Sequence, residues 1–257
     1  MSGWLTRRRR EKIRARPCPP VWRAIIEKNV PYVAGLPSAD RDELAGHVQV
    51  FLAEKYFEGC GGLQITDEIR VTIAAQACIL LLHRQTDYYP KLVSILVYPT
   101  TYVVPGGRRT ADGLVDDEPQ ARLGESWVRD AVVLAWDSAR AGAADEHDGH
   151  NVVLHEFAHQ LDQETGAGNG APVLPRRSMY VAWARVLGRE FDQLVHDATL
   201  HHRTLLDQYG ATNPAEFFAV ATEAFFERPL DLRARHPELY QQLQQFYCQD
   251  PAALLRR

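Results

Sequence analysis

Apolar residues recur along most of the chain at the three- and four-residue spacing of helices, and only two short stretches have the composition of strands. The pattern predicts helices over 21–30, about 38–58, 69–82, 152–162, 178–198, 213–226 and 238–248. Residues 92–98 and 131–136 are rich in β-branched side chains and predict strands. Residues 105–123 and 139–149 predict loops. The result is an α+β fold, mostly helical, with a small mixed sheet preceding helix 152–162.

The charged residues are evenly mixed along the chain except at the N-terminus. The 257 residues carry a formal net charge of −4, which argues against a protein that binds nucleic acid through bulk electrostatics. The exception is a basic run at the N-terminus, formed by Arg7, Arg8, Arg9, Arg10, Lys12, Arg14 and Arg16. Such a run either contacts phosphate groups or anionic lipid or, as we expect here, forms a solvated and poorly ordered terminus.

The cysteines and the apolar runs indicate a cytoplasmic protein. Cys18, Cys60, Cys78 and Cys248 are scattered without C-x-x-C spacing, so they predict separate reduced thiols. The sequence has no apolar signal-peptide core after Met1. Its longest apolar run, 71–82, is too short to cross a bilayer, so we expect it to form a buried helix.

The candidate chemistry lies in helix 152–162, which contains the pattern H-E-x-x-H. His155 and His159 are four residues apart, so one helical face presents both imidazoles to the same point. Glu156 lies beside them, where its carboxylate can reach a water molecule at that point. A catalytic zinc ion needs three protein ligands and one open position, and this helix offers two ligands and a general base. The alternative is a pair of hydrogen-bonded core histidines with a solvent-facing glutamate.

A third ligand must come from another segment, and spacing leaves the choice open. Glu216 begins an apolar helix, but with Asn213 three residues earlier it also matches a capping box. Glu223 lies on the same face of that helix, as a rival ligand or as a partner of a ligand. Asp162, one turn after His159, either orients a ligand histidine or is a surface carboxylate.

Several blocks carry a family resemblance. His155-Glu156-Phe157-Ala158-His159, with Tyr209-Gly210 and Ala215-Glu216-Phe217-Phe218, resembles the gluzincin metallopeptidases. Over about residues 22–251 the chain resembles more closely the Mlc titration factor A family of bacterial cytosolic zinc peptidases. The blocks that carry this match are Asn29-Val30-Pro31, residues 67–77, Ser94-Ile95-Leu96-Val97-Tyr98-Pro99 and Gly124-Glu125-Ser126-Trp127. The catalytic core of anthrax lethal factor is a more distant likeness.

The resemblance implies a zincin-like peptidase domain over 21–257, with a helical part to about residue 90 and a catalytic part from about 91, preceded by the basic segment 1–20. It implies Zn²⁺ held by His155, His159 and Glu216. Glu156 then serves as general base, and Tyr209 stabilises the tetrahedral intermediate. We expect hydrolysis of peptide bonds, aminopeptidase-like on small peptides. The alternative that the resemblance implies is a regulator that sequesters a glucose-uptake transcription repressor of the Mlc type, with peptidase activity secondary.

Overall fold

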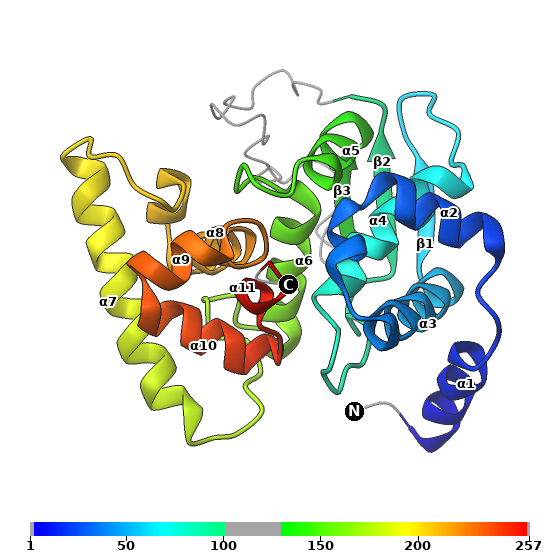
Figure 1. Ribbon diagram of the computed structural model, residues 1–257, viewed down its shortest axis with the longest axis horizontal. Coiled ribbons are helices and arrows are strands. Elements are labelled where there is room, and N and C mark those ends of the chain that lie inside the picture. The colour runs from blue at the N-terminus through cyan, green and yellow to red at the C-terminus, as the bar shows by residue number, and fades with distance from the viewer. Residues whose placement is uncertain (1–2, 101–129, 256–257) are drawn as a thin grey trace.

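The computed structural model describes residues 3–100 and 130–255, and helices account for most of them (Figure 1). The N-terminal half contains helices α1 (Trp4–Arg14), α2 (Pro20–Asn29), α3 (Ser38–Glu54) and α4 (Asp67–Ile79), with the 3-10 turn η1 (Pro31–Gly35). Helix α5 (Trp136–Ala144) leads to α6 (Val152–Asp162), which is followed by the 3-10 turn η3 (Gln163–Thr165). The C-terminal half contains α7 (Met179–Thr199), the 3-10 turn η4 (Gln208–Ala211), α8 (Pro214–Glu227), α9 (Pro229–Arg235), α10 (Pro237–Tyr247) and α11 (Pro251–Leu254). The α+β fold class is thereby confirmed.

The sheet contains three short strands in the order β1-β2-β3: β1 (Tyr56–Gly59), β2 (Ser94–Tyr98) and β3 (Ala131–Ala135). Tyr56 pairs with Ser94 and Ser94 with Ala131, and both strand pairs are parallel. A mixed sheet was expected, but the described strands are all parallel. The physical reason is the connection between them: a crossover such as α4, which lies between β1 and β2 in the chain, joins parallel strands.

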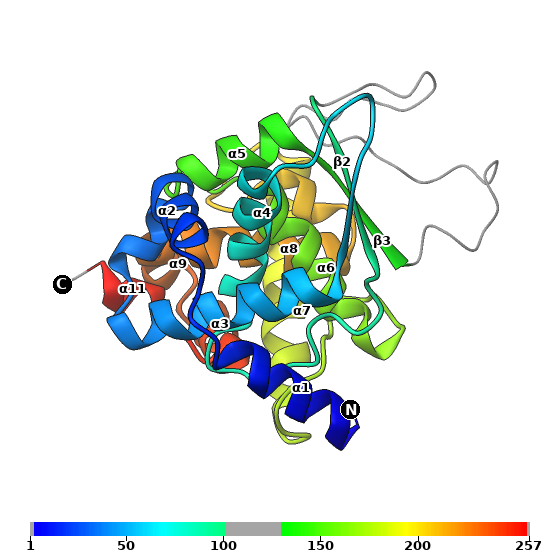
Figure 2. The same ribbon diagram turned by 90° about the vertical axis from the view of Figure 1, so that its right-hand side faces the viewer.

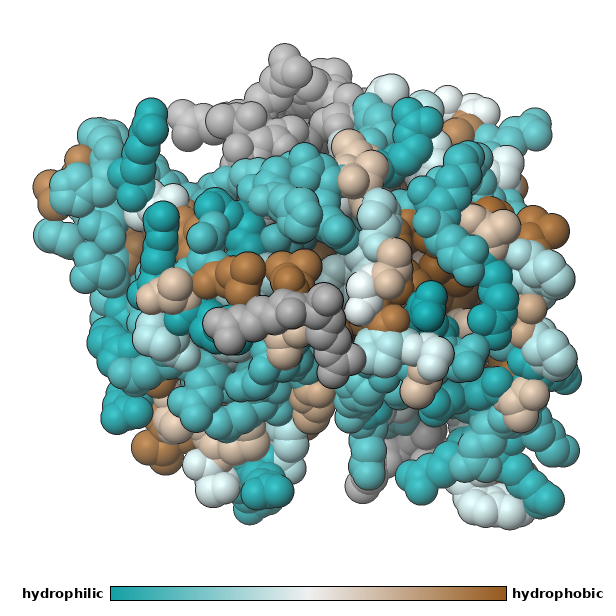
Figure 3. Space-filling view, viewed as in Figure 1, coloured by the Kyte–Doolittle hydropathy of each residue, from teal (hydrophilic) through white to brown (hydrophobic). Residues whose placement is uncertain are grey.

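Helix α6 lies at the centre of the molecule, packed on α8 on one side and on α4 on the other (Figures 1 and 2). Helix α4 is apolar around most of its circumference because α2, α3, α5 and α6 all contact it. Phe157 of α6 lies 5.6 Å from Phe51 of α3 and 4.9 Å from Tyr89, ring centroid to ring centroid. The surface seen in Figure 3 is mainly hydrophilic, as expected for a core enclosed in this way.

Several predicted boundaries are corrected by the structure. The helix predicted to run from Ser38 to about residue 58 ends at Glu54, because 56–59 form β1, and its N-cap residue is Pro37. The predicted loop 139–149 is largely helix α5. Helices α1, α9 and α11 were not predicted from the sequence, and the predicted loop 105–123 lies outside the described residues. The other predicted helices and both strands are present, with ends shifted by a few residues.

The predicted burial of residues 71–82 and the separate thiols are confirmed, although the helix itself ends at Ile79 and residues 80–82 form a turn. Residues 71–82 are all buried, and all four cysteines are free. In the described part of the chain, no helix is both long and apolar enough to cross a membrane.

Candidate metal centre

Helix α6 begins at a strong N-cap, which fixes where its histidines lie. Asn151 accepts hydrogen bonds through Oδ1 from the N–H groups of Val153 and Leu154, at 3.1 and 3.0 Å. Its side-chain amide donates to Gln76 Oε1 and to the Gly142 carbonyl, both at 3.0 Å. A cap that satisfies the first turn in this way stabilises a helix by about 1 kcal/mol. This role of Asn151 was not predicted, although an asparagine directly before an apolar helix is typical of an N-cap.

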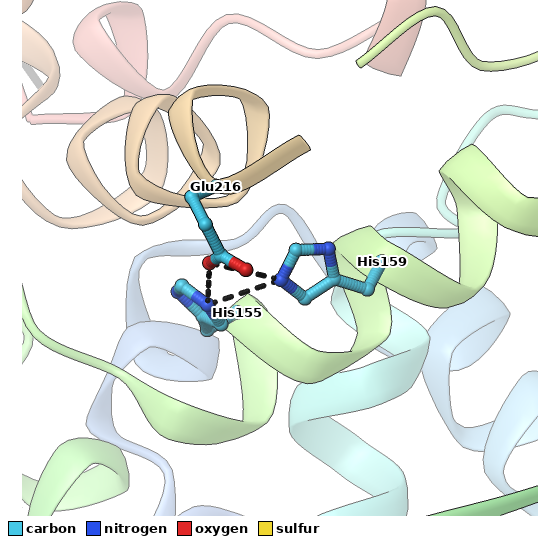
Figure 4. Close-up of side chains that lie close together, drawn as sticks. All are labelled: His155, His159 and Glu216. Atoms are coloured by element: carbon cyan, nitrogen blue, oxygen red, sulfur yellow. Dashed lines mark hydrogen bonds and ion pairs between the residues drawn. The ribbon is translucent and has the colours of Figure 1, made fainter. Parts of the chain in front are cut away.

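His155 and His159 point from α6 toward Glu216 of α8 (Figure 4). Nε2 of His155 lies 3.0 Å from Oε2 of Glu216, and Nε2 of His159 lies 3.2 Å from the same oxygen. The two Nε2 atoms are 3.2 Å apart. A tetrahedral ion with bonds of 2.0–2.1 Å separates neighbouring ligand atoms by about 3.3 Å. The triangle of donor atoms therefore fits a metal ion of that size and geometry.

Glu216 does not serve as the reciprocal half of a capping box. Asn213 caps α8 by accepting hydrogen bonds from the N–H groups of Ala215 and Glu216, at 2.9 and 3.0 Å. The Glu216 carboxylate points instead at the two imidazoles. Burial raises the pKa of Glu216, but the hydrogen bonds with His155 and His159 outweigh this and lower the pKa to about 2. The carboxylate is therefore ionised and available as a ligand at neutral pH.

Glu223 is a partner of a candidate ligand rather than a rival for its place. One carboxylate oxygen lies 2.8 Å from Nδ1 of His155, and the other accepts the backbone N–H of Asn151 at 2.5 Å. Burial opposes a charged imidazole, but hydrogen bonds with Glu216 and Glu223 outweigh it and raise the pKa of His155 to about 10. Burial also raises the pKa of Glu223, against the hydrogen bonds with His155 and Asn151. Without a metal ion the ring is therefore charged at neutral pH and carries a proton on each nitrogen. Glu223 holds the proton on Nδ1, so the proton on Nε2 is the one that a metal ion would displace.

Asp162 has neither of the two roles that the sequence left open, orienting a ligand histidine or lying on the surface. It is fully buried and accepts the N–H of Gly170 at 2.7 Å, and the described hydrogen bonds and ion pairs do not join it to a histidine. Gly170 has φ +77°, and a Cβ there would overlap the carbonyl oxygen of Pro214. Asp162 thus holds the loop after α6 close against the first residue of α8, two positions before Glu216.

Glu156 and Tyr209 both lie at the edge of the cluster. Glu156 is half-buried on α6, and within the described residues its carboxylate has no hydrogen-bond partner. The Tyr209 ring lies 6.1 Å from the His155 ring, centroid to centroid, and Asp207 accepts the Tyr209 N–H at 2.7 Å. His147 and His150 remain outside the cluster, and His150 lies 3.6 Å from Asp207. His155, His159 and Glu216 thus form a group of possible metal ligands, which we call the metal-type cluster. The other two predicted site residues, Glu156 and Tyr209, lie beside it.

Known proteins resemble the chain over nearly its whole length. The model of the glucose-regulated metallo-peptidase M90 family matches residues 4–248. An uncharacterized protein of Synechocystis sp. is 43% identical over 249 residues, which cover 96% of this chain and 90% of that protein. Mlc titration factor A of Yersinia pestis and that of Yersinia pseudotuberculosis are each 31% identical over 234 residues, or 89% of this chain and 85% of the relative. The resemblance inferred from the motif blocks is thereby confirmed. The chain belongs to the glucose-regulated metallo-peptidase M90 family, so a metal ion is expected at a site of the kind described above.

Proposed function

We propose that this protein is a zinc-dependent peptidase that hydrolyses peptide bonds at the cluster of His155, His159 and Glu216. The observation that carries the proposal is the convergence of two imidazole nitrogens and one carboxylate oxygen, all within 4.8 Å of one another. Two histidines and a glutamate are a ligand set of catalytic zinc. A structural zinc site is less suitable, because such sites are closed by four protein ligands and usually include cysteine.

Besides the three metal ligands, three side chains have a role in the proposed reaction. When bound, Zn²⁺ would polarise the scissile carbonyl and lower the pKa of the attacking water. Glu156 accepts the proton of that water and delivers it to the leaving amine, since it neighbours a ligand and has no partner of its own among the described residues. Tyr209, whose ring lies beside His155, donates its O–H to the developing oxyanion. Glu223 keeps Nδ1 of His155 protonated, so that Nε2 would be the nitrogen available to hold the ion.

We further propose that the substrates are small peptides with a free N-terminus, as the family resemblance implies. The test compares peptides with free and blocked N-termini, using wild type and Glu156→Gln at matched zinc content. Activity confined to the wild type supports the mechanism, and a preference for free N-termini supports aminopeptidase action. Full activity of Glu156→Gln with zinc bound would show that the base is misassigned. Equal cleavage of blocked peptides would show endopeptidase action.

A second candidate function rests on the name of the relatives, Mlc titration factor A. It is a regulatory role in which the protein sequesters a repressor of the Mlc type and peptide hydrolysis is secondary. The discriminating measurement is binding of a purified repressor of this type to wild type and Glu156→Gln. Equal affinity would favour sequestration, whereas cleavage of the repressor by the wild type alone would make it a substrate. Absence of a complex and of cleavage would eliminate this candidate.

A further inference from the structure

A groove of about 930 Å³ lies between α1 and the segment that includes α2 and α3, away from the metal-type cluster. One wall is basic and is formed by Arg8, Arg9, Lys12 and Arg16. Apolar surface comes from Trp22 and Leu52, which are partly buried against the core. We call this feature the basic groove. Its volume is at the upper end of the range for ligand pockets, so it has room for much more than a single inorganic anion.

The basic wall is held in place by the arginines on the inner face of α1. Arg10 donates to Glu54 at 2.9 Å and to Asp87 at 3.2 Å, and its guanidinium lies 4.8 Å from the centre of the Tyr88 ring. Arg14 lies 3.9 Å from Glu43. Helix α1 is therefore held against α3 mainly through Arg10, whose side chain is 12% exposed, and the expectation of a solvated terminus does not describe that side chain. Arg14, four residues later on the same face, is exposed and adds a looser ion pair.

The side chains facing the groove differ from Arg10 and Arg14 in having no counter-charge. Within the described residues, no carboxylate lies within 4 Å of Arg8, Arg9, Lys12 or Arg16. Residues 1–16 contain seven basic side chains and one acidic one, although the whole chain has a net charge of −4. Two acidic side chains beside the groove are already engaged: Asp67 accepts from Trp22 Nε1 at 2.9 Å and pairs with Arg70, and Glu54 pairs with Arg10. Uncompensated positive charge in a concave surface concentrates the potential and attracts anionic ligands.

We propose that the basic groove binds an acidic, amphipathic peptide segment of a partner protein. Its carboxylates would contact Arg8, Arg9 and Lys12, and its apolar side chains would contact Trp22 and Leu52. The concave shape favours a peptide over a flat membrane surface, since a bilayer cannot enter a groove with walls on both sides. Helix α1 contacts α3, while the metal-type cluster lies on α6 and α8, so this binding is independent of the proposed peptidase chemistry.

The test measures the fluorescence anisotropy of a labelled 14-residue helical peptide with glutamates on one face and leucines on the other. Two altered peptides isolate the contributions, one with glutamine in place of glutamate and one with serine in place of leucine. The variant Arg8→Gln/Arg9→Gln/Lys12→Gln removes three exposed positive charges from the groove. Its matched control, Arg176→Gln/Arg177→Gln/Arg203→Gln, removes three exposed positive charges elsewhere. All six are surface positions, so both variants are expected to fold.

We expect saturable binding to the wild type, weakened about tenfold or more by the groove variant and by either altered peptide, and changed less than about twofold by the control variant. Raising the salt from about 0.1 M to 1 M should also weaken it, because the Debye length falls from about 10 Å to 3 Å. Equal loss in both variants would show non-specific attraction and overturn the proposal. So would the absence of peptide binding, or a groove-dependent attachment to vesicles of anionic lipid without peptide binding. Full displacement of the peptide by equimolar pyrophosphate would assign the groove to a small anion instead.

Discussion

Replacing Glu223 by glutamine tests whether the buried carboxylate behind His155 sets the metal affinity of the site. Glu223 accepts two hydrogen bonds, from Nδ1–H of His155 at 2.8 Å and from the backbone N–H of Asn151 at 2.5 Å. Glutamine has the same shape but only one acceptor oxygen. If that oxygen faces Asn151, the amide N–H₂ faces Nδ1 and favours the tautomer that carries its proton on Nε2. If it faces His155, two N–H groups oppose each other at Asn151.

Either orientation should weaken metal binding. Partners of metal-ligating histidines contribute about 10- to 100-fold in affinity, which is about 1.4–2.7 kcal/mol. Glu223 is at the upper end of this range because its side chain is only 8% exposed, so water cannot replace the lost partner. The assay is a competition titration of Zn²⁺ between the protein and a chromophoric chelator. Far-ultraviolet circular dichroism would verify that the variant is folded.

Glu227→Gln is the matched control, since Glu227 is also a buried glutamate of α8, one turn further on, and the described contacts do not join it to a histidine. Its metal affinity should stay within about threefold of the wild type. A zinc affinity of Glu223→Gln within threefold of the wild type would refute the reasoning, because it would mean that the tautomer of His155 is set elsewhere. An equal loss in both variants would point to general loosening of α8.

Three further outcomes follow from the same structure. Tyr209→Phe should lower kcat about 100-fold at unchanged zinc content, because the O–H group that stabilises the oxyanion is removed. Steady-state kinetics on a peptide with a free N-terminus measures kcat, and an unchanged value would contradict this role of Tyr209. Burial, followed by the charge of Glu223, raises the pKa of Glu227 to about 9, above its value in the unfolded chain. The native state then binds the extra proton, so wild-type stability should fall relative to Glu227→Gln as the pH rises from about 5 to 9, by at most about 1.4 kcal/mol per pH unit. Urea unfolding of both proteins at the two ends of this pH range measures the difference in their stability. The same pH dependence in both proteins would contradict the prediction. Gly170→Ala should destabilise the protein by about 1–3 kcal/mol and weaken zinc binding, because the added methyl group displaces the start of α8. Thermal unfolding and the chelator titration test both effects, and unchanged values would show that the loop absorbs the methyl group.

The elements that could be predicted are those whose signal is local. Helix α6 has an asparagine cap followed by apolar residues, and α4 has a continuous apolar run, so neighbouring residues were sufficient. Strand β1 has only four residues, and it exists because it pairs with β2, whose first residue is 38 positions later. That information is not present in any short window of the sequence.

Helix α5 was not predicted, for a different reason. Its buried positions are Ala139, Gly142 and Ala143, which are too small to give an apolar periodicity. They are small because the helix approaches the start of α6 closely: a Cβ on Gly142 would lie 3.1 Å from Cα of Asn151. The third candidate ligand was similarly undetermined, because spacing describes Glu216 equally well as a cap. Only the position of α8 against α6 shows where its carboxylate points.

The relation between α6 and α8 depends on more than the H-E-x-x-H pattern. Glu216 and Glu223 are seven residues apart, two helical turns, so α8 presents both from one face, about 10 Å apart along its axis. Glu216 contacts the Nε2 side of His155, and Glu223 contacts its Nδ1 side. The second carboxylate also accepts the N–H of Asn151, whose side chain caps α6 and reaches Gln76 of α4. The imidazole is therefore held from both edges by one helix, and that helix is tied to the first residue before α6. We conclude that the geometry of the candidate metal site is a property of the α4–α6–α8 packing, and that a change at Asn151 or Gln76 should alter it without touching any proposed ligand.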